Sequence, residues 1–282
     1  MSGVINTGSH PKLLWPGVRE VWGQVYDSHP TQYTDLYDVR NSTRAYEQDV
    51  QVTGFGLAPV KSQGGQISYD SEMQGWVTTY AHIAYALGYI VTKEELEDNL
   101  YKEVSQRRAK ANAFSINQTV ENVGAFLYNN AFVGTFFTTP DGRPLIDTLH
   151  VNASGGTFSN RLTTPADLSE ASIEDMCIQI MQTTQDRGLR ISVMPRSLHI
   201  APQEWYNANR ILKSVLQNNS GNNAINVLKA TNALPEGIKL NHYFTDPDAW
   251  FLRTNIMNGM TMFWRNQPKF DQDNDFDTMN AK

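Results

Sequence analysis

Few side chains in this sequence could carry out chemistry, and their spacing favours structural roles. The single cysteine, Cys177, lies on the apolar stripe of an expected helix, which indicates a core position and not a nucleophile. His199 lies in an apolar stretch and is expected to be a satisfied core or edge residue. None of the six histidines has a second histidine at metal-ligand spacing; they are His10, His29, His82, His150, His199 and His242.

One group of possible cation ligands surrounds a proline near the C-terminal end. His242, Asp246 and Asp248 carry the imidazole and carboxylate groups that divalent ions bind. However, Asp246 directly precedes Pro247, and this pair is typical of a turn ahead of a strand. The turn is therefore the simpler interpretation of these residues.

A second acidic group imitates the start of a calcium-binding loop. Asp271, Asp273 and Asp275 alternate as the first ligands of an EF-hand do. Phe276 stands where that loop requires glycine, and Lys282 stands where it requires glutamate, so the match fails. With Asp277, these alternating acids instead predict one face of an extended strand turned to solvent or to a partner.

The remaining motifs give no reaction either. Arg107, Arg108 and Lys110 could touch a phosphate backbone, although a solvated helix face is the favoured interpretation. The sequence has no phosphate-binding glycine loop, no nucleophile elbow and no His-Glu-x-x-His zinc motif. We therefore predict no catalytic, cofactor-binding or metal-binding residue, no cofactor, and a protein that is not an enzyme.

Composition sets the outer bounds. The 282 residues are 40% hydrophobic and 18% charged, which is ordinary for a folded protein with a real core. The net charge of −6 argues against a broadly basic surface that coats nucleic acid. Since the chain has one cysteine, it has no intramolecular disulfide. The first ten residues lack the apolar core of a signal peptide. No apolar run approaches the roughly 20 residues that a membrane-spanning helix needs.

The first half of the chain predicts an irregular start, a hairpin and a long helix. Residues 1–44 show little periodicity beyond a short helix at Pro16–Tyr26, and they form either an arm that docks on other surfaces or a terminal segment on its own domain. Residues 46–91 predict two extended runs around a glycine-rich tip, with strand formers again at Tyr85–Val91. Such a long hairpin either contacts a neighbouring molecule or packs on a sheet of its own domain. Thr92 and Glu95 predict a capping box for a helix to about Asn130, with an interruption near Ser115–Asn117.

The second half mixes short elements without a regular βαβ repeat. The expected class is therefore α+β. Residues 132–166 are expected to be loop and short strand with a turn at Pro140–Gly142, and an acidic run begins at Phe270. The expected helices span Ser169–Arg187, ended by Gly188, and Pro202 to about Gln217, with a helical turn at Ala224–Ala230. The expected strands are Ile191–Met194, Leu198–Ala201, Ile238–Phe244, Trp250–Thr254 and Met260–Arg265.

Three segments in this order resemble a known family. They are Leu168-Ser169 leading into the helix ended by Gly188, the stretch Pro195–Pro202, and the stretch Asp246–Leu252. Together with a long hairpin before a long helix, they resemble a tailed-bacteriophage major capsid protein of the Hong Kong 97 fold, in the branch of Mu-like major head subunits. The resemblance covers most of residues 46–282.

The resemblance implies a domain organisation. Residues 1–45 would be the N-terminal arm, and residues 46–91 the extended E-loop hairpin. Residues 92–131 and 246–282 would form the peripheral domain with its spine helix, and residues 132–245 the axial domain. Some relatives crosslink subunits through a lysine, and Lys61 lies at the hairpin tip where such a lysine would sit. One lysine in a loop is no evidence of a crosslink, so the sequence leaves this question open.

The resemblance also implies a function and partners. The chain would assemble with itself into hexamers and pentamers of an icosahedral shell that encloses double-stranded DNA without sequence-specific binding. A portal protein would occupy one vertex, scaffold and decoration proteins are possible partners, and a separate scaffold is expected. The protein would lie in the virion after assembly in the bacterial cytoplasm, with no membrane partner.

Three alternatives remain at this point. The first is the shell of an encapsulin-type cellular compartment with the same fold. The second, from a different class, is an enzyme with a cryptic carboxylate site around Asp246 and Asp248. The third is another phage structural or interaction protein.

Overall fold

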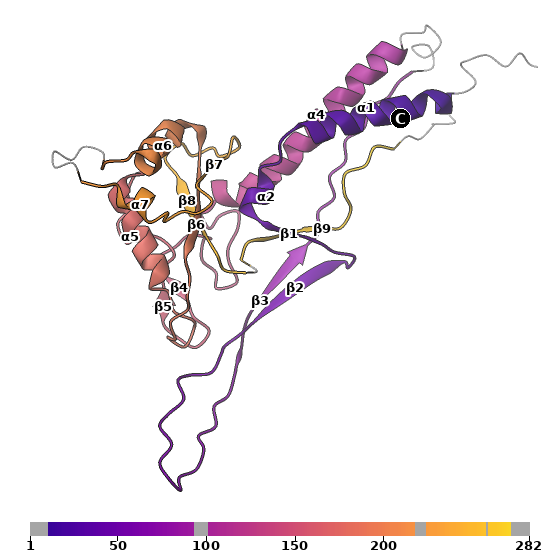
Figure 1. Cartoon of the computed structure of the whole chain (residues 1–282). Helices are drawn as coiled ribbons and strands as arrows, with labels where there is room; N and C mark the ends of the chain where they lie inside the picture. The colour runs from indigo at the N-terminus through magenta and orange to yellow at the C-terminus, as the bar shows by residue number, and fades with distance from the viewer. Residues whose placement is uncertain (1–10, 93–100, 218–223, 258, 272–282) are drawn as a thin grey trace, which may run out of the picture. The chain divides into compact units, whose positions relative to one another are not determined.

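The computed structural model describes residues 11–92, 101–217, 224–257 and 259–271, with the backbone alone for 11–17 and 101–104. The chain divides into two compact units (Figure 1). The first unit contains Met1–Thr34, His82–Gly124 and Trp264–Lys282, and the second contains Asp35–Ala81 and Ala125–Phe263. No described helix is long and apolar enough to cross a membrane.

The first unit is built on two helices. Helix α1 (Pro11–Ser28) extends beyond both ends of the helix predicted at Pro16–Tyr26. Its Val18 and Trp22 are buried against Ala109 and Ala113 of helix α4, because the two alanines leave room for the indole ring. Residues from 18 onward in α1 thus lie on their own domain, as the second of the two alternatives for this segment expected.

Helix α4 (Tyr101–Asn129) is long, as predicted, and it ends one residue before the expected Asn130. Its predicted capping box lies partly outside the described residues, since Glu95 is not among them. The predicted interruption near Ser115–Asn117 was wrong. The helix is continuous through these residues, and the hydroxyl of Thr119 donates to the Ser115 carbonyl one turn earlier.

A two-stranded hairpin dominates the start of the second unit. Strand β2 (Tyr46–Val52) pairs antiparallel with β3 (Gln74–Ala81), as the sequence predicted for the outgoing and returning runs. Thr53 closes the ladder because its backbone N–H and hydroxyl both bond to Met73. Residues 54–73 continue as two long arms without strand pairing (Figure 1). The strand predicted around Tyr85–Val91 does not form beyond a single bridge residue at Val91.

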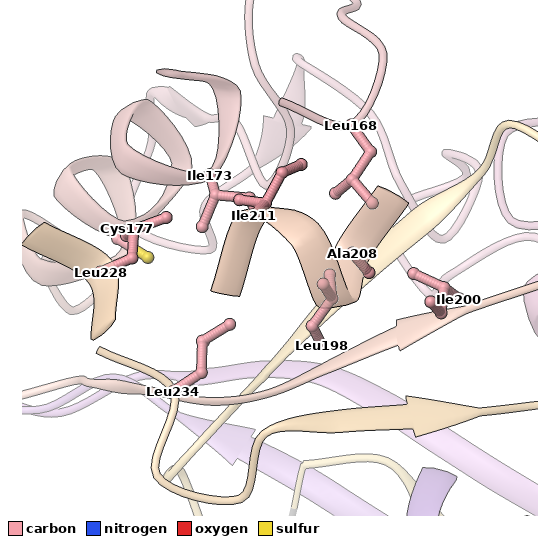
Figure 2. Close-up of a cluster of buried hydrophobic side chains, with 9 residues drawn as sticks. All are labelled: Leu168, Ile173, Cys177, Leu198, Ile200, Ala208, Ile211, Leu228 and Leu234. Atoms are coloured by element: carbon pink, nitrogen blue, oxygen red, sulfur yellow. The ribbon is translucent and has the colours of Figure 1, made fainter. Parts of the chain in front are cut away.

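The core of the second unit lies between a three-stranded sheet and three helices. Strand β6 (Pro195–Ile200) is central, parallel to β7 (Ile238–Leu240) and antiparallel to β8 (Trp250–Thr254). Leu198 and Ile200 share one face of β6 and meet the helices, as Figure 2 shows. The buried cluster comprises Leu168, Ile173, Cys177, Leu198, Ile200, Ala208, Ile211, Leu228 and Leu234.

Helix α5 is shorter than predicted. It spans Glu170–Met181 and begins with a capping box between Ser169 and Ser172, in agreement with the predicted start. Gly188 does not end this helix, contrary to the prediction. Gly188 instead takes a φ of +82° inside a separate reverse turn, which the Thr184–Arg190 bridge closes.

The other elements are short. The Ile191–Met194 strand was wrong, because these residues lead into β6 without ladder pairing. The remaining elements are α2 (Tyr33–Leu36), β1 (Asp38–Asn41) paired with β9 (Thr261–Trp264), β4 (His150–Val151) paired with β5 (Thr157–Phe158), the 3₁₀ turn η2 (Pro202–Glu204), α6 (Trp205–Lys213) and α7 (Val227–Ala230). Helices and strands are mixed, so the predicted α+β class agrees with the structure.

Candidate assembly interface

The hairpin of residues 46–81 exposes apolar side chains on both of its faces. Val60 is 100% exposed, Tyr69 is 92% exposed and Leu57 is 84% exposed, all on the arms beyond the paired strands. Val50 and Val52 on β2 are also exposed, as are Trp76 and Val77 on β3. Alternate residues of a strand face opposite sides, so Trp76 and Val77 show that neither face is covered within the described chain.

This exposure has an energetic consequence. A two-stranded hairpin alone is at best marginally stable in water, because it lacks a second layer that could bury its side chains. Each large apolar side chain that moves from water into a packed interface contributes on the order of 1.5 to 3 kcal/mol. Strands β2 and β3 also pair only with each other in the described part of the chain, so each offers one open edge. The hairpin is thus the largest candidate for a contact with another molecule.

A second exposed apolar group lies next to helices α6 and α7. Leu216 and Ile225 form an isolated antiparallel bridge, which brings residues 215–217 and 224–227 side by side. Val215, Leu216, Ile225 and Val227 are all exposed there. Below them, Asn226 is buried and donates to the carbonyl of Ile211, which holds these segments on α6.

The candidate chemical residues have structural roles where the structure describes them. Cys177 is buried in the cluster around β6, and burial followed by the nearby Glu174 raises the pKa of its thiol. His199 is buried on the opposite face of β6 from Leu198, and its Nε2 lies 2.9 Å from the Ser197 hydroxyl, as the prediction of a satisfied core residue expected. A thiol with a raised pKa is a poor nucleophile at neutral pH.

The acidic groups do not converge on an ion among the described residues. Asp246 accepts a hydrogen bond of 3.1 Å from the backbone N–H of Asp248, which is the geometry of the predicted turn. No group of three or more His, Cys, Asp or Glu in the described ranges could hold a metal. Asp271 is exposed, and Asp273, Asp275 and Asp277 lie outside the described residues.

The basic residues of α4 differ in their contacts. Arg107 and Lys110 are exposed, in agreement with a solvated helix face. Arg108 donates to the carbonyl of Ile90 at 3.3 Å. Lys61 is exposed at the tip region of the hairpin. Contact of Arg107, Arg108 or Lys110 with a nucleic acid stays a prediction.

Sequence reasoning missed a buried pair in the second unit. His150 Nδ1 lies 2.8 Å from Asp141 Oδ2, and the imidazole stacks on Phe158. Burial alone would raise the pKa of Asp141, but hydrogen bonds from Thr139, His150 and two backbone N–H groups outweigh it and lower the pKa to about 2. The predicted turn at Pro140–Gly142 was the one signal in the sequence for this arrangement. Asp141 and His150 are nine residues apart, and nothing in their spacing indicated that they would be in contact.

The arrangement offers no evident reaction centre. A shallow hollow of about 490 Å³ lies beside α5 and is lined by one carboxylate, that of Asp175, among threonines, serines, alanines, Leu162 and Gln179. It contains no imidazole, thiol or amine that could act with the carboxylate. Among the described residues, the hairpin is therefore the strongest candidate for a functional surface, because it carries the most exposed apolar side chains.

These features define a class by fold: the chain has the architecture of a chain found in bacteriophage capsids. It is similar to a chain of the bacteriophage JBD30 procapsid, with a TM-score of 0.53 and 14% identity over 84% of this chain and 99% of that chain. It is similar to chains of the JBD30 capsid decorated with minor capsid protein trimers (TM-score 0.56) and of the JBD30 capsid (TM-score 0.54), each at 12% identity over 77% of this chain and 92% of that chain. No protein-family model and no curated protein matches the sequence.

Proposed function

We propose that this chain is a major capsid protein that assembles with copies of itself into hexamers and pentamers of an icosahedral phage head. The single observation that carries the proposal is the hairpin of residues 46–81, which exposes apolar side chains on both of its faces. A repeated contact between one surface of a subunit and a different surface of the next produces closed rings and shells when the rotation closes. The likeness to chains of JBD30 capsids supports this choice of partner.

The proposed domain organisation follows the Hong Kong 97 pattern in its Mu-like branch. The hairpin is the E-loop within residues 46–91. Residues 1–45 are the N-terminal arm, whose helix α1 packs on α4 within its own unit. Helix α4 is the spine of a peripheral domain that comprises residues 92–131 and 246–282. Residues 132–245 form the axial domain, and the exposed side chains of Val215, Leu216, Ile225 and Val227 suit a contact near the centre of a hexamer or pentamer.

The proposed partners follow from the same assignment. The shell encloses double-stranded DNA without sequence-specific contacts, and the net charge of −6 suits containment without tight binding to the wall. A portal protein replaces one pentamer, and a scaffold and decoration proteins act during assembly; the JBD30 capsid itself is decorated with minor capsid protein trimers. The protein acts in the virion after assembly in the host cytoplasm, and we propose no enzymatic activity.

Electron microscopy of the purified full chain tests the proposal. We expect closed shells, alone or with a co-expressed scaffold, and nuclease-protected DNA in particles from infected cells. Small oligomers of fixed size in every condition would overturn the proposal. Shells that enclose a cargo protein in place of DNA would favour the encapsulin-type compartment.

Substitutions on the hairpin arms test the observation that carries the proposal. Leu57→Ser with Val60→Ser removes two exposed apolar groups and leaves the fold of the subunit unchanged, because neither side chain is buried in it. We expect assembly to require at least a tenfold higher subunit concentration, the factor for about 1.4 kcal/mol. Gln63→Ser with Gln66→Ser is the matched control, since both side chains are polar and exposed on the same arms. Equal assembly of both double variants would remove the hairpin from the interface.

A further inference from the structure

The hairpin is held where its paired strands end. Beyond the Thr53–Met73 closure, one contact crosses between the two arms: the backbone N–H of Gly56 donates to Asp70 Oδ2 at 2.9 Å. The same carboxylate lies 2.6 Å from Arg187 Nη1, in the reverse turn that follows α5. Gln185 of that turn donates to the carbonyl of Phe55 at 3.4 Å. Both arms are therefore tied to one turn.

That turn is itself rigid. The backbone N–H of Gln185 bonds to the Leu189 carbonyl at 2.7 Å, and the N–H of Gly188 bonds to the Gln185 carbonyl at 2.8 Å. Gly188 has a φ of +82°, which a side chain would resist. The guanidinium of Arg187 thus comes from a fixed piece of backbone.

A second turn supports the first and touches the base of the hairpin. The backbone N–H of Ser154 donates to Asp186 Oδ2 at 3.0 Å, and its hydroxyl donates to the Asp186 carbonyl at 2.6 Å. The neighbouring Ala153 packs against Gly75 of β3 so closely that a Cβ at Gly75 would lie 2.9 Å from the Ala153 Cβ. We call Asp70, Gln185, Asp186, Arg187 and Ser154 the polar clasp.

We infer that the polar clasp sets the direction in which the hairpin leaves the second unit, and that it thereby sets the curvature and size of the assembled shell. The inference rests on the proposed function, because the hairpin acts as the contact between copies. Its residues are positioning residues: they do not touch the neighbouring copy but hold the segment that does. A small change in the angle between two contact surfaces decides whether a ring or shell closes, and at what size.

The charges of the clasp indicate when it holds. The N–H of Gly56, the guanidinium of Arg187 and the N–H of Ser71 all bind the carboxylate and lower the pKa of Asp70 to about 2. A carboxylate with a lowered pKa contributes its full stabilisation above the ordinary value near 4, and loses it as the pH falls from there toward 2. Asp70 is therefore charged at neutral pH, where it can accept all three hydrogen bonds.

Two single variants and their combination test the clasp in the full chain. Asp70→Ala and Arg187→Ala each remove one partner of an exposed ion pair, so the subunit folds as before. Hydrogen exchange of the unassembled chain is the first measurement. We expect the hydrogen-bonded amides within residues 54–73, such as that of Gly56, to exchange roughly fivefold faster in Arg187→Ala. They should exchange faster still in Asp70→Ala, which also removes the acceptor of Gly56, and no faster in the double variant than in Asp70→Ala, because Arg187 acts on this segment through Asp70.

A matched ion pair supplies the control. Arg196 and Glu236 form an exposed pair in the same unit that does not involve the hairpin. Glu236→Ala should leave exchange of residues 54–73 unchanged. Gly75→Val provides an independent approach, since its side chain would displace the hairpin from Ala153 and should raise the same exchange rates.

Particle size is the second measurement. We expect the clasp variants to form shells with a broad range of diameters or open sheets, while wild type and Glu236→Ala form shells of one size. Unchanged exchange, or faster exchange with unchanged shell size, would overturn the inference while the proposed function stands. Failure of wild type to assemble would overturn the proposed function, and the exchange data would still decide whether the clasp holds the hairpin.

Discussion

His199 gives the second unit a sensitivity to acid that can be worked out from its surroundings. The imidazole is 2% exposed in the central strand β6 and has the hydroxyl of Ser197 as its partner. Burial lowers its pKa from 6.5 to about 4; Asp35 opposes this shift, and Arg253 and Lys239 add to it. Asp35 is paired with Lys239, and Arg253 with Asp38, so these neighbouring charges are largely compensated among themselves.

The sign follows from proton linkage. The unfolded chain binds a proton at this histidine below pH 6.5, whereas the folded chain does not until about pH 4. The free energy of unfolding is therefore highest above pH 6.5 and falls as the pH decreases toward 4. The expected loss from His199 alone is about 1 to 2 kcal/mol at pH 5.5 and roughly 2 to 3 kcal/mol at pH 4.5, with a limit of about 3 kcal/mol at lower pH.

Urea denaturation of the full, unassembled chain measures this loss. Trp205 and Trp250 pack against the cluster around β6, so their fluorescence reports unfolding of the second unit. His199→Gln keeps a hydrogen-bonding group near Ser197 but does not ionise, and carboxylates titrate equally in both proteins. We expect the difference in the free energy of unfolding between pH 7 and pH 4.5 to be about 2 to 3 kcal/mol smaller in this variant.

A second histidine provides the comparison. His242 is exposed, and His242→Gln should keep the pH dependence of the wild type. Parallel stability curves for wild type and His199→Gln between pH 7 and 4.5 would refute the reasoning, because the acid sensitivity would then come from other groups.

Three further expectations concern packing. Gly124→Ala should destabilise the first unit by about 1 to 3 kcal/mol and lower its melting temperature, since the new Cβ would lie 2.7 Å from the Cβ of Tyr33. Gly23→Ala in α1 is the control: its Cβ would meet nothing within 4 Å, so this variant should raise the melting temperature. Equal changes in melting temperature for the two variants would contradict the packing argument. Trp22→Ala should lower the free energy of unfolding, measured by urea denaturation, by about 3 to 5 kcal/mol, because it loses ring stacking within the first unit and a buried hydrogen bond. A decrease below about 1 kcal/mol would show that α1 is not packed on α4. Cys177 should react with a thiol reagent far more slowly in native buffer than in urea, and equal rates would argue against its burial.

Local sequence signals predicted the elements whose determinants lie within them. The strand Trp250–Thr254 has the predicted bounds, and the hairpin of residues 46–81 follows from strand formers on both sides of a glycine-rich tip. The likeness to phage capsid proteins is confirmed at the level of the fold. Gly188 was misassigned because a glycine that ends a helix and one that closes a separate turn leave the same local signal.

Contacts between distant segments were beyond local reasoning. Glu121 of α4 is buried and accepts hydrogen bonds from the backbone N–H groups of Gln32 and Tyr33, which nothing in the spacing of these residues indicates. The polar clasp likewise depends on Asp70 meeting Arg187, which is 117 residues away in the chain. Such pairs arise from the register of packed elements, and one sequence does not encode that register in a local pattern.

The order of synthesis has a consequence for the central sheet. Strand β6 pairs with β8, whose last residue is Thr254, whereas the hairpin is complete at Ala81. At about 5 to 20 residues per second, a ribosome needs roughly 10 to 35 s to add the intervening segment. During that interval the apolar side chains of the hairpin are exposed, and the sheet of β6, β7 and β8 has not yet formed. The yield of correctly folded subunits should therefore depend on chaperones that shield the hairpin during translation.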